Sequence, residues 1–291
     1  MLGQGRNGAP LAYRGAPQSG SGAGRRRALI VLCGVGALAL LLVVGLVVSL
    51  TGLFSSDDDA PAQTGGVGQS STGAAEPEEA VAGSGPQAEA ALARRPMLAV
   101  AVAAALPHAL STRSAGSPIA VPAPEQVTGT LVPTGFPDTP EGAIGQVLEV
   151  TRAGMAGADP QTWARAYSSL AEPGAAPPEQ TPMGRNLISF RRSANMADTG
   201  PREGLRLSWA PTSALIKGAT ADGSYVVACV LGEFVIDYKG RVINAGLGNC
   251  LPMRRVGNQW RIASGPAAWA APATWPGSAE AVAAGYREIQ Q

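Results

Sequence analysis

The chain has 291 residues, with 22 basic and 21 acidic side chains and a formal net charge of +1. This balance argues against a dedicated nucleic-acid-binding protein, because such domains are usually strongly basic. A single histidine, His108, and three cysteines exclude zinc sites with two or more histidines and structural sites built from four thiolates. Glycine (38) and proline (24) make up about a fifth of the chain, which predicts that much of it is linker.

The N-terminal region combines a polar arm with a long uncharged stretch. Residues 1–27 are rich in Gly, Pro, Ala, Ser and Arg, and predict a disordered arm. The 23 residues 28–50 carry no charge. As a helix they span about 34 Å, enough to cross roughly 30 Å of hydrocarbon. A cleavable signal peptide is the alternative, but its apolar region usually has only about 7–15 residues. We therefore predict an uncleaved transmembrane helix.

The charges on either side of this apolar stretch predict its orientation. Three arginines precede it at 25–27, and three aspartates follow it at 57–59. The positive-inside rule then places residues 1–27 in the cytoplasm and the rest of the chain outside. We expect a single-pass protein of the cell membrane, with the lipid bilayer as one partner and an extracytoplasmic C-terminal domain.

Residues 51–137 are rich in Gly, Ala and Pro and predict a flexible linker. Within this stretch, residues 97–106 (MLAVAVAAAL) are too few to cross a bilayer. This segment is either a short helix or strand that docks on another part of the protein, or a low-complexity alanine tract.

A folded domain is predicted over residues 138–291, and it begins with about three helices. Thr139, Asp159 and Thr181 each stand directly before a proline. A capping side chain followed by proline at the first helical position is typical of a helix start. Apolar residues recur at helical spacing after each of these starts.

Strand patterns follow these helices, at residues 205–209, 214–219, 225–238, 241–255 and 259–263. Helices followed by a run of strands predict an α+β fold, with the helices packed on one face of an antiparallel meander. Residues 278–291 then predict a capped amphipathic helix at the end of the chain. Tyr286 and Ile289 lie on its apolar stripe and are candidate contacts for a partner protein.

Cys229 and Cys250 lie on the two strands that flank the turn Lys239-Gly240. With a two-residue loop, the cysteines stand directly opposite each other as a non-hydrogen-bonded pair, which suits a disulfide. With a three-residue loop and a bulge at Gly240, Cys250 faces the other side unless a second bulge restores the register. Because an exterior location favours oxidation, we predict a Cys229–Cys250 disulfide. Two buried thiols are the alternative.

Groups that carry chemistry are few in the predicted domain. It contains no phosphate-binding or dinucleotide-binding loop, and we expect no cofactor, no metal and no catalytic residue. Glu233 and Asp237 share a face of one strand, where they form either an acid pair in a cavity or part of a solvated surface. Arg254 and Arg255 belong to the densest basic cluster. They are candidate contacts for an acidic partner, or they protect an exposed strand edge.

Three segments resemble the nuclear-transport-factor-like, or cystatin-like, cone fold: 225–230 (YVVACV), 240–243 (GRVI) and 258–262 (NQWRI). The resemblance implies helices packed on a curved antiparallel sheet. A short arm, one span and such an external domain resemble the VirB-type bitopic scaffold components of type IV secretion and the TcpC-like conjugation proteins. Residues 136–142 (FPDTPEG) and 275–278 (WPGS), with the Gly/Pro linker, resemble membrane proteins of actinomycete integrative and conjugative elements.

These resemblances imply a non-enzymatic scaffold or accessory component of a conjugation or type IV secretion apparatus. Such a component binds other envelope proteins, forms a homo-oligomer in some cases, and makes no direct contact with nucleic acid. Two alternatives stay open. The chain also resembles the Mce-associated membrane proteins, which support lipid import. A cone domain that binds a small ligand or acts as an isomerase needs an acid with a raised pKa in an apolar pocket, for which Glu233 and Asp237 are the candidates.

Overall fold

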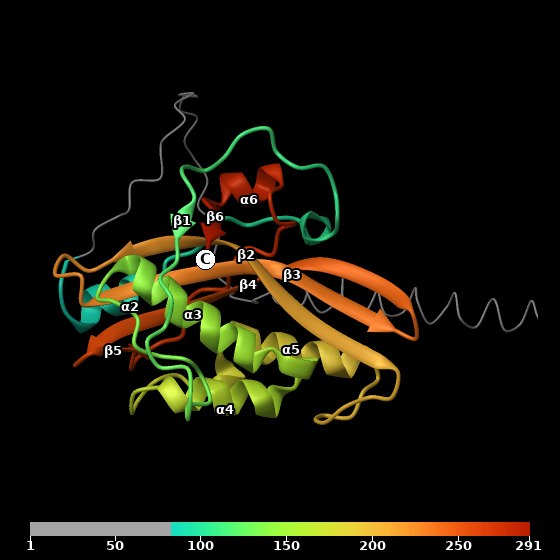
Figure 1. Cartoon of the computed structure of the whole chain (residues 1–291). Coiled ribbons are helices and arrows are strands. Elements are labelled where there is room, and N and C mark those ends of the chain that lie inside the picture. Colours follow the sequence, from blue (N-terminus) through green and yellow to red (C-terminus); the bar gives the residue numbers. More distant parts are fainter. Residues whose placement is uncertain (1–82) are drawn as a thin grey trace, which may run out of the picture. The chain divides into compact units, whose positions relative to one another are not determined.

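The computed structural model describes residues 83–291. The predicted arm, the predicted transmembrane helix at 28–50 and the first part of the predicted linker lie outside the described residues. Within residues 83–291, no helix has the length and apolar character that a bilayer crossing requires. The described part is an α+β structure in which helices pack on a curled, six-stranded mixed sheet (Figure 1).

Three helices precede the long strands, and each begins where the sequence predicts. They are α3 (Pro140–Gly154), α4 (Pro160–Leu170) and α5 (Pro182–Ser193). The side chains of Thr139, Asp159 and Thr181 accept hydrogen bonds from backbone N–H groups in the first turns. These bonds satisfy donors that a helix leaves free at its start. The predicted caps are therefore confirmed.

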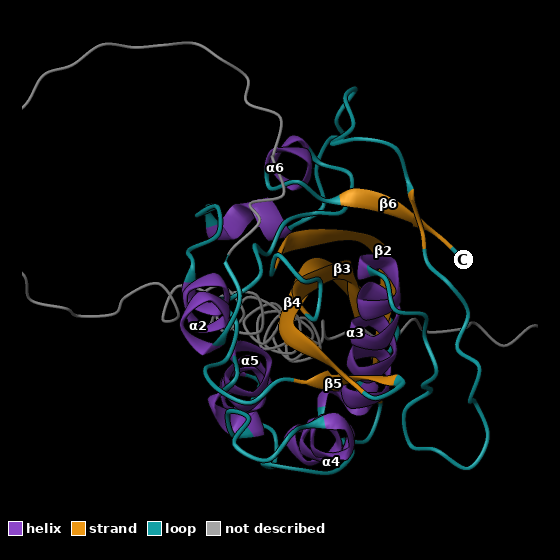
Figure 2. Cartoon of the chain, turned by 90° about the vertical axis from the view of Figure 1, so that its left-hand side faces the viewer, coloured by secondary structure: helices purple, strands orange, loops and turns teal. Residues whose placement is uncertain are grey.

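The sheet has the strand order β1-β6-β2-β3-β4-β5. Its strands are β1 (Ile119–Ala120), β2 (Leu205–Ala219), β3 (Tyr225–Tyr238), β4 (Arg241–Val256), β5 (Gln259–Ile262) and β6 (Arg287–Gln290). The pair β1–β6 is parallel and the other pairs are antiparallel. The two strands expected at 205–209 and 214–219 are one strand, β2, whose register shifts twice, between Pro211 and Ser213 and between Ile216 and Gly218. Such bulges bend a strand, and the sheet curls into a half-barrel (Figure 2).

Both faces of the sheet are buried. Residues Val226, Ala228 and Val230 of β3 pack in one core cluster with α3, α4 and α5. Their neighbours Val227 and Cys229 pack in a second cluster on the opposite face. Because side chains alternate between the faces of a strand, burial on both faces explains why β3 is an almost continuous apolar run.

The second face is covered by chain segments from both ends of the described region. The helix α2 (Pro86–Arg94) and the short 3₁₀ turn Val102–Ala105 lie against it, with Leu92, Ala93 and Ala105 buried. The structure thus places a large part of the expected linker, 51–137, on the domain itself. Small alanine side chains allow this close packing, so residues 97–106 dock rather than stand free.

The C-terminal helix predicted over 278–291 is wrong beyond its first turn. The helix α6 covers only Ala279–Ala283, and Ser278 caps it as expected. Gly285 then adopts a φ of 91°, which ends the helix. The remaining residues form β6, which pairs with β1 and β2. Backbone pairing with the sheet therefore overrides the amphipathic pattern.

The Cys229–Cys250 disulfide is present. The turn Lys239-Gly240 has two residues, both with positive φ (53° and 81°), as a type I′ turn requires. The β3–β4 register runs without a shift and places the two cysteines directly opposite each other, with their Cα atoms 4.0 Å apart. This spacing is that of a close, non-hydrogen-bonded pair. The alternative with a three-residue loop is thereby excluded.

Candidate functional site

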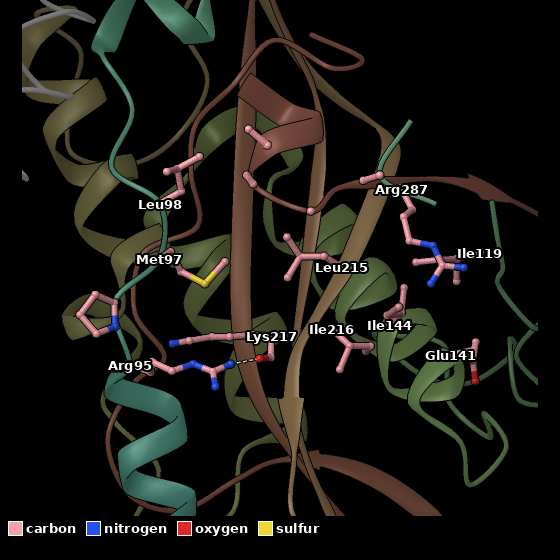
Figure 3. Close-up of a pocket in the computed structure, with 15 residues that line it drawn as sticks. Arg95, Met97, Leu98, Ile119, Glu141, Ile144, Leu215, Ile216, Lys217 and Arg287 are labelled. Atoms are coloured by element: carbon pink, nitrogen blue, oxygen red, sulfur yellow. Dashed lines mark hydrogen bonds between the residues drawn. The ribbon is translucent and has the colours of Figure 1, made fainter. Parts of the chain in front are cut away.

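A pocket of about 550 Å³ opens beside β2. We call it the edge pocket. Its lining includes residues of β2, of the segment after α2, of α3, of the loop before β1, of β1 itself, and of the stretch from α6 to β6 (Figure 3). The lining residues are Arg95, Pro96, Met97, Leu98, Ala115, Ile119, Glu141, Ile144, Leu215, Ile216, Lys217, Ala283, Ala284, Gly285 and Arg287.

The edge pocket lies along an open edge of the sheet. Three consecutive residues of β2, Leu215 to Lys217, line it. Consecutive side chains point to opposite faces of a strand, so a space that all three border lies at the edge of β2. The strand β6 pairs with β2 only at Ser213 and Ala214. Residues 215–217 therefore have β3 on one side and the pocket on the other.

Lys217 is the buried cation of this site. It lies in the bulge of β2, where no residue of β3 pairs with it, and only 5% of its surface is exposed. Its Nζ donates a 2.9 Å hydrogen bond to the backbone oxygen of Ala93, near the C-terminal end of α2. A helix C-terminus favours a positive charge. Burial, together with the positive charge of Arg95, still lowers the pKa of Lys217 to about 8.

Two arginines add positive charge to the edge pocket. Arg95 donates from Nη2 to the backbone oxygen of Lys217, and Arg287 donates from Nε to the backbone oxygen of Ser117 over 2.6 Å. Figure 3 shows Arg95 and Lys217 on one side of the pocket and Arg287 on the other, with Leu215 between them. Within residues 83–291, none of these three cations is in an ion pair.

This arrangement suits the binding of a negatively charged, partly apolar group. Among the described residues that line the pocket, Glu141 is the only acid, against three cations, and aliphatic side chains such as Ile144 and Leu98 supply most of the remaining walls. An anion from outside would compensate the desolvated charge of Lys217. Among the described residues, no group of three His, Cys, Asp or Glu is placed to hold a metal ion.

The candidate contacts Arg254 and Arg255 are engaged within the domain. Arg254 contacts Glu89 of α2 and Glu172 after α4, each with an N–O distance of 2.5 Å, and lies over the ring of Tyr225. Arg255 lies over the ring of Trp260 and donates a hydrogen bond to the backbone oxygen of Phe136. Both arginines therefore tie peripheral segments to the edge of the sheet.

The other sequence-based candidates are not among the residues that line the edge pocket. Tyr286 is 4% exposed, and its hydroxyl faces the backbone oxygen of Pro272, so its ring is not on the surface. Ile289 is half-buried in β6 opposite Ile119. Neither residue belongs to a helical stripe, since the predicted helix ends before them.

Glu233 and Asp237 lie on the opposite face from the core under α3. They alternate along β3 with Phe234 and Ile236, which pack in the cluster beneath the helices. The Asp237 Oδ1 accepts a hydrogen bond from the backbone N–H of Gly240 and so stabilises the turn. Neither residue is among those that line the edge pocket.

Sequence reasoning missed Arg95, Lys217 and Arg287 as members of one site. These residues are far apart in the chain, and only the packing of both ends of the domain brings them together. One signal was present: Lys217 interrupts an apolar strand and is one of two lysines in the chain. A lone lysine in a buried strand indicates a charge with a specific partner or function.

Comparison with known proteins identifies no relative. The scan of family models, the search of curated proteins and the search of solved structures each found no match. The fold and the site define an α+β protein with a positively charged pocket at an open sheet edge.

Proposed function

We propose that the chain is a non-enzymatic, single-pass membrane protein whose extracytoplasmic domain binds other envelope proteins. The observation that carries this proposal is the edge pocket, where an open stretch of β2 lies among three cations that form no ion pair within residues 83–291. Open strand edges pair readily with other chains. A protein segment can therefore use both the backbone and the charge of this site.

The membrane location is supported by two features. Residues 28–50 are uncharged and long enough to cross a bilayer, with arginines before them and aspartates after them. The Cys229–Cys250 disulfide suits an oxidising compartment. Together they favour a cytoplasmic N-terminus and an external domain.

The finer fold assignment supports the same role. The helices α3, α4 and α5 on one face of a curled sheet, with a long β3–β4 hairpin, agree with a nuclear-transport-factor-like cone. External domains of this kind on a bitopic anchor resemble the scaffold components of type IV secretion and conjugation systems. We therefore place the protein as a scaffold or accessory component of such an apparatus.

Protease shaving and crosslinking of intact cells test this proposal. A protein with tags at both ends should lose its C-terminal tag to external protease and keep its N-terminal tag. Crosslinking in cells followed by purification should bring down at least one other envelope protein. A protected C-terminal tag would refute the topology, and the absence of any crosslinked envelope protein would refute the scaffold role.

A further inference from the structure

We propose that the edge pocket binds an extended, acidic segment of a partner protein, which adds as a strand to β2. This inference deepens the proposed function, since it names the part of a partner that the domain recognises. It depends on three observations: the stretch of β2 beyond Ala214 that no strand pairs with on the side of the pocket, the shape of the surrounding walls, and the excess of positive charge.

The backbone of β2 is available over a length that suits a short strand. The strand β6 ends its pairing at Ala214, and β2 continues to Ala219 with β3 on its other side only. A segment bound there would continue the row that β6 occupies. Main-chain hydrogen bonds give affinity in such strand addition, and pockets for side chains give specificity.

The walls of the edge pocket suit a strand with side chains on both faces. Met97 borders it on the face that carries the disulfide, and Ile144 borders it on the face that carries α3. Leu98, the next residue after Met97, also lines it. Leu98 is 47% exposed and has apolar surface left to cover. Aliphatic side chains of a bound strand can contact these walls above and below the edge.

The charges select an acidic segment. Arg95 and Lys217 lie on one side of the pocket and Arg287 on the other (Figure 3), so acidic side chains on either face of the bound strand meet a cation. No carboxylate of residues 83–291 is in an ion pair with any of the three. Charge complementarity of this kind raises association rates and excludes basic partners.

Arg95 has a double role in this proposal. Its guanidinium now donates to the backbone oxygen of Lys217, in place of the N–H that a neighbouring strand would supply. Such a contact protects an open edge from unwanted pairing. A bound strand replaces this donor and leaves Arg95 to pair with an acidic side chain.

Binding of a defined peptide to the full-length protein in detergent tests the inference. The probe is a fluorescent hexapeptide of alternating glutamate and valine, blocked at both ends. Its matched control is the same peptide with N-methyl groups on alternate amides, in both registers. These groups remove the backbone donors and leave the charge unchanged. One of the two methylated peptides carries its methyl groups on the amides that face β2. We expect this peptide to bind at least tenfold more weakly than the unmethylated probe.

Three substitutions locate the binding site. Arg287→Gln and Leu98→Asp should each weaken binding of the probe at least fivefold, because one removes a cation and the other places an acid on the wall. Leu98 is exposed, so its substitution leaves the fold intact even where the other variant is unstable. Arg241→Gln, at the exposed start of β4, should leave binding unchanged.

Equal binding of both N-methylated peptides would overturn strand addition and indicate a site for small anions. Equal binding of the probe to all three variants would overturn the location. The proposed function fails separately. If the peptide binds as expected but no envelope protein is crosslinked in cells, the result supports the binding site and contradicts the scaffold role. If crosslinking persists in the Arg287→Gln and Leu98→Asp variants, the scaffold role stands without this pocket.

Discussion

Lys217 lines the candidate site and also affects the stability of the domain. Its Nζ holds the end of α2 through the backbone oxygen of Ala93, yet its charge is desolvated and lies close to Arg95. When a lysine is buried without an anionic partner, the loss of solvation disfavours its charged form in the folded state. The free energy of unfolding should therefore depend on the protonation of Lys217.

The stability of the domain should increase between pH 7.5 and 9.5. The pKa of Lys217 falls from an ordinary value of 10.5 to about 8 on folding, so the unfolded chain binds more protons in this range. Stability rises with pH wherever the unfolded state binds more protons. We expect an increase of about 2 kcal/mol in the free energy of unfolding, measured by denaturant titration at each pH.

Two lysine variants provide the controls for this measurement. Lys217→Met should remove the increase, and Lys239→Met, at the exposed hairpin turn, should retain it. Above about pH 10 the trend reverses, because burial raises the pKa of Tyr167 to about 12 and the unfolded tyrosine ionises first. A flat profile in the unchanged protein, or the same rise in Lys217→Met, would contradict the assignment.

At the level of elements, the second face of the sheet depends on glycines in β4. A Cβ atom at Gly246 would lie 1.7 Å from the backbone oxygen of Thr274, and one at Gly248 would lie 2.8 Å from the Cβ of Ala271. The segment after β5 thus crosses β4 where the strand has no side chain. Close approach of another backbone is one reason for glycine inside a strand.

Gly246→Ala should therefore destabilise the domain strongly. The atom it meets belongs to the backbone of Thr274, which is fully buried, so relief requires the whole segment to move. We expect a loss of about 3 kcal/mol in the free energy of unfolding, at the upper end of ordinary overpacking. Gly83→Ala, where no atom lies within 4 Å, is the matched control and should be neutral. Equal stability of the two variants would show that the crossing is absent.

Elements with local signals were predictable, and elements set by long-range contacts were not. The helix starts at Thr139, Asp159 and Thr181 were predictable because a capping side chain bonds to the backbone within the first turn. The sequence left two loop lengths open for the hairpin, and the structure has the two-residue turn that places Cys229 opposite Cys250. The end of the chain carries a helical pattern too, but Arg287–Gln290 pairs with strands far away in sequence. Tertiary pairing overrides such a local preference.

At the scale of the whole domain, both ends of the described chain complete one structure. Residues 86–106 and 263–286 together cover the face of the sheet that α3 does not. Composition alone suggested a linker for the first of these segments, since alanine dominates it and the wider stretch 51–137 is rich in Gly, Ala and Pro. The edge pocket forms between the same two ends, so it could not be assembled from either segment by itself.

The disulfide lies beneath these covering segments and joins the central strands. Cys229 and Cys250 are almost fully buried, and the bond closes a loop with a sequence separation of 21. In the chain-entropy account, a cross-link of this length stabilises the folded state by about 3 kcal/mol. The double variant Cys229→Ala/Cys250→Ala should lose about this much in the free energy of unfolding, measured by denaturant titration.

Thiol counting on the same protein checks the bond in its native compartment. The chain has three cysteines, so protein taken from membranes and denatured without reductant should show one reactive thiol, from Cys33, and three after reduction. Three thiols before reduction would show that the domain lies in a reducing compartment, and would contradict the external location together with the bond. The Cys33→Ala variant should show none before reduction and two afterwards, which assigns the remaining pair to Cys229 and Cys250.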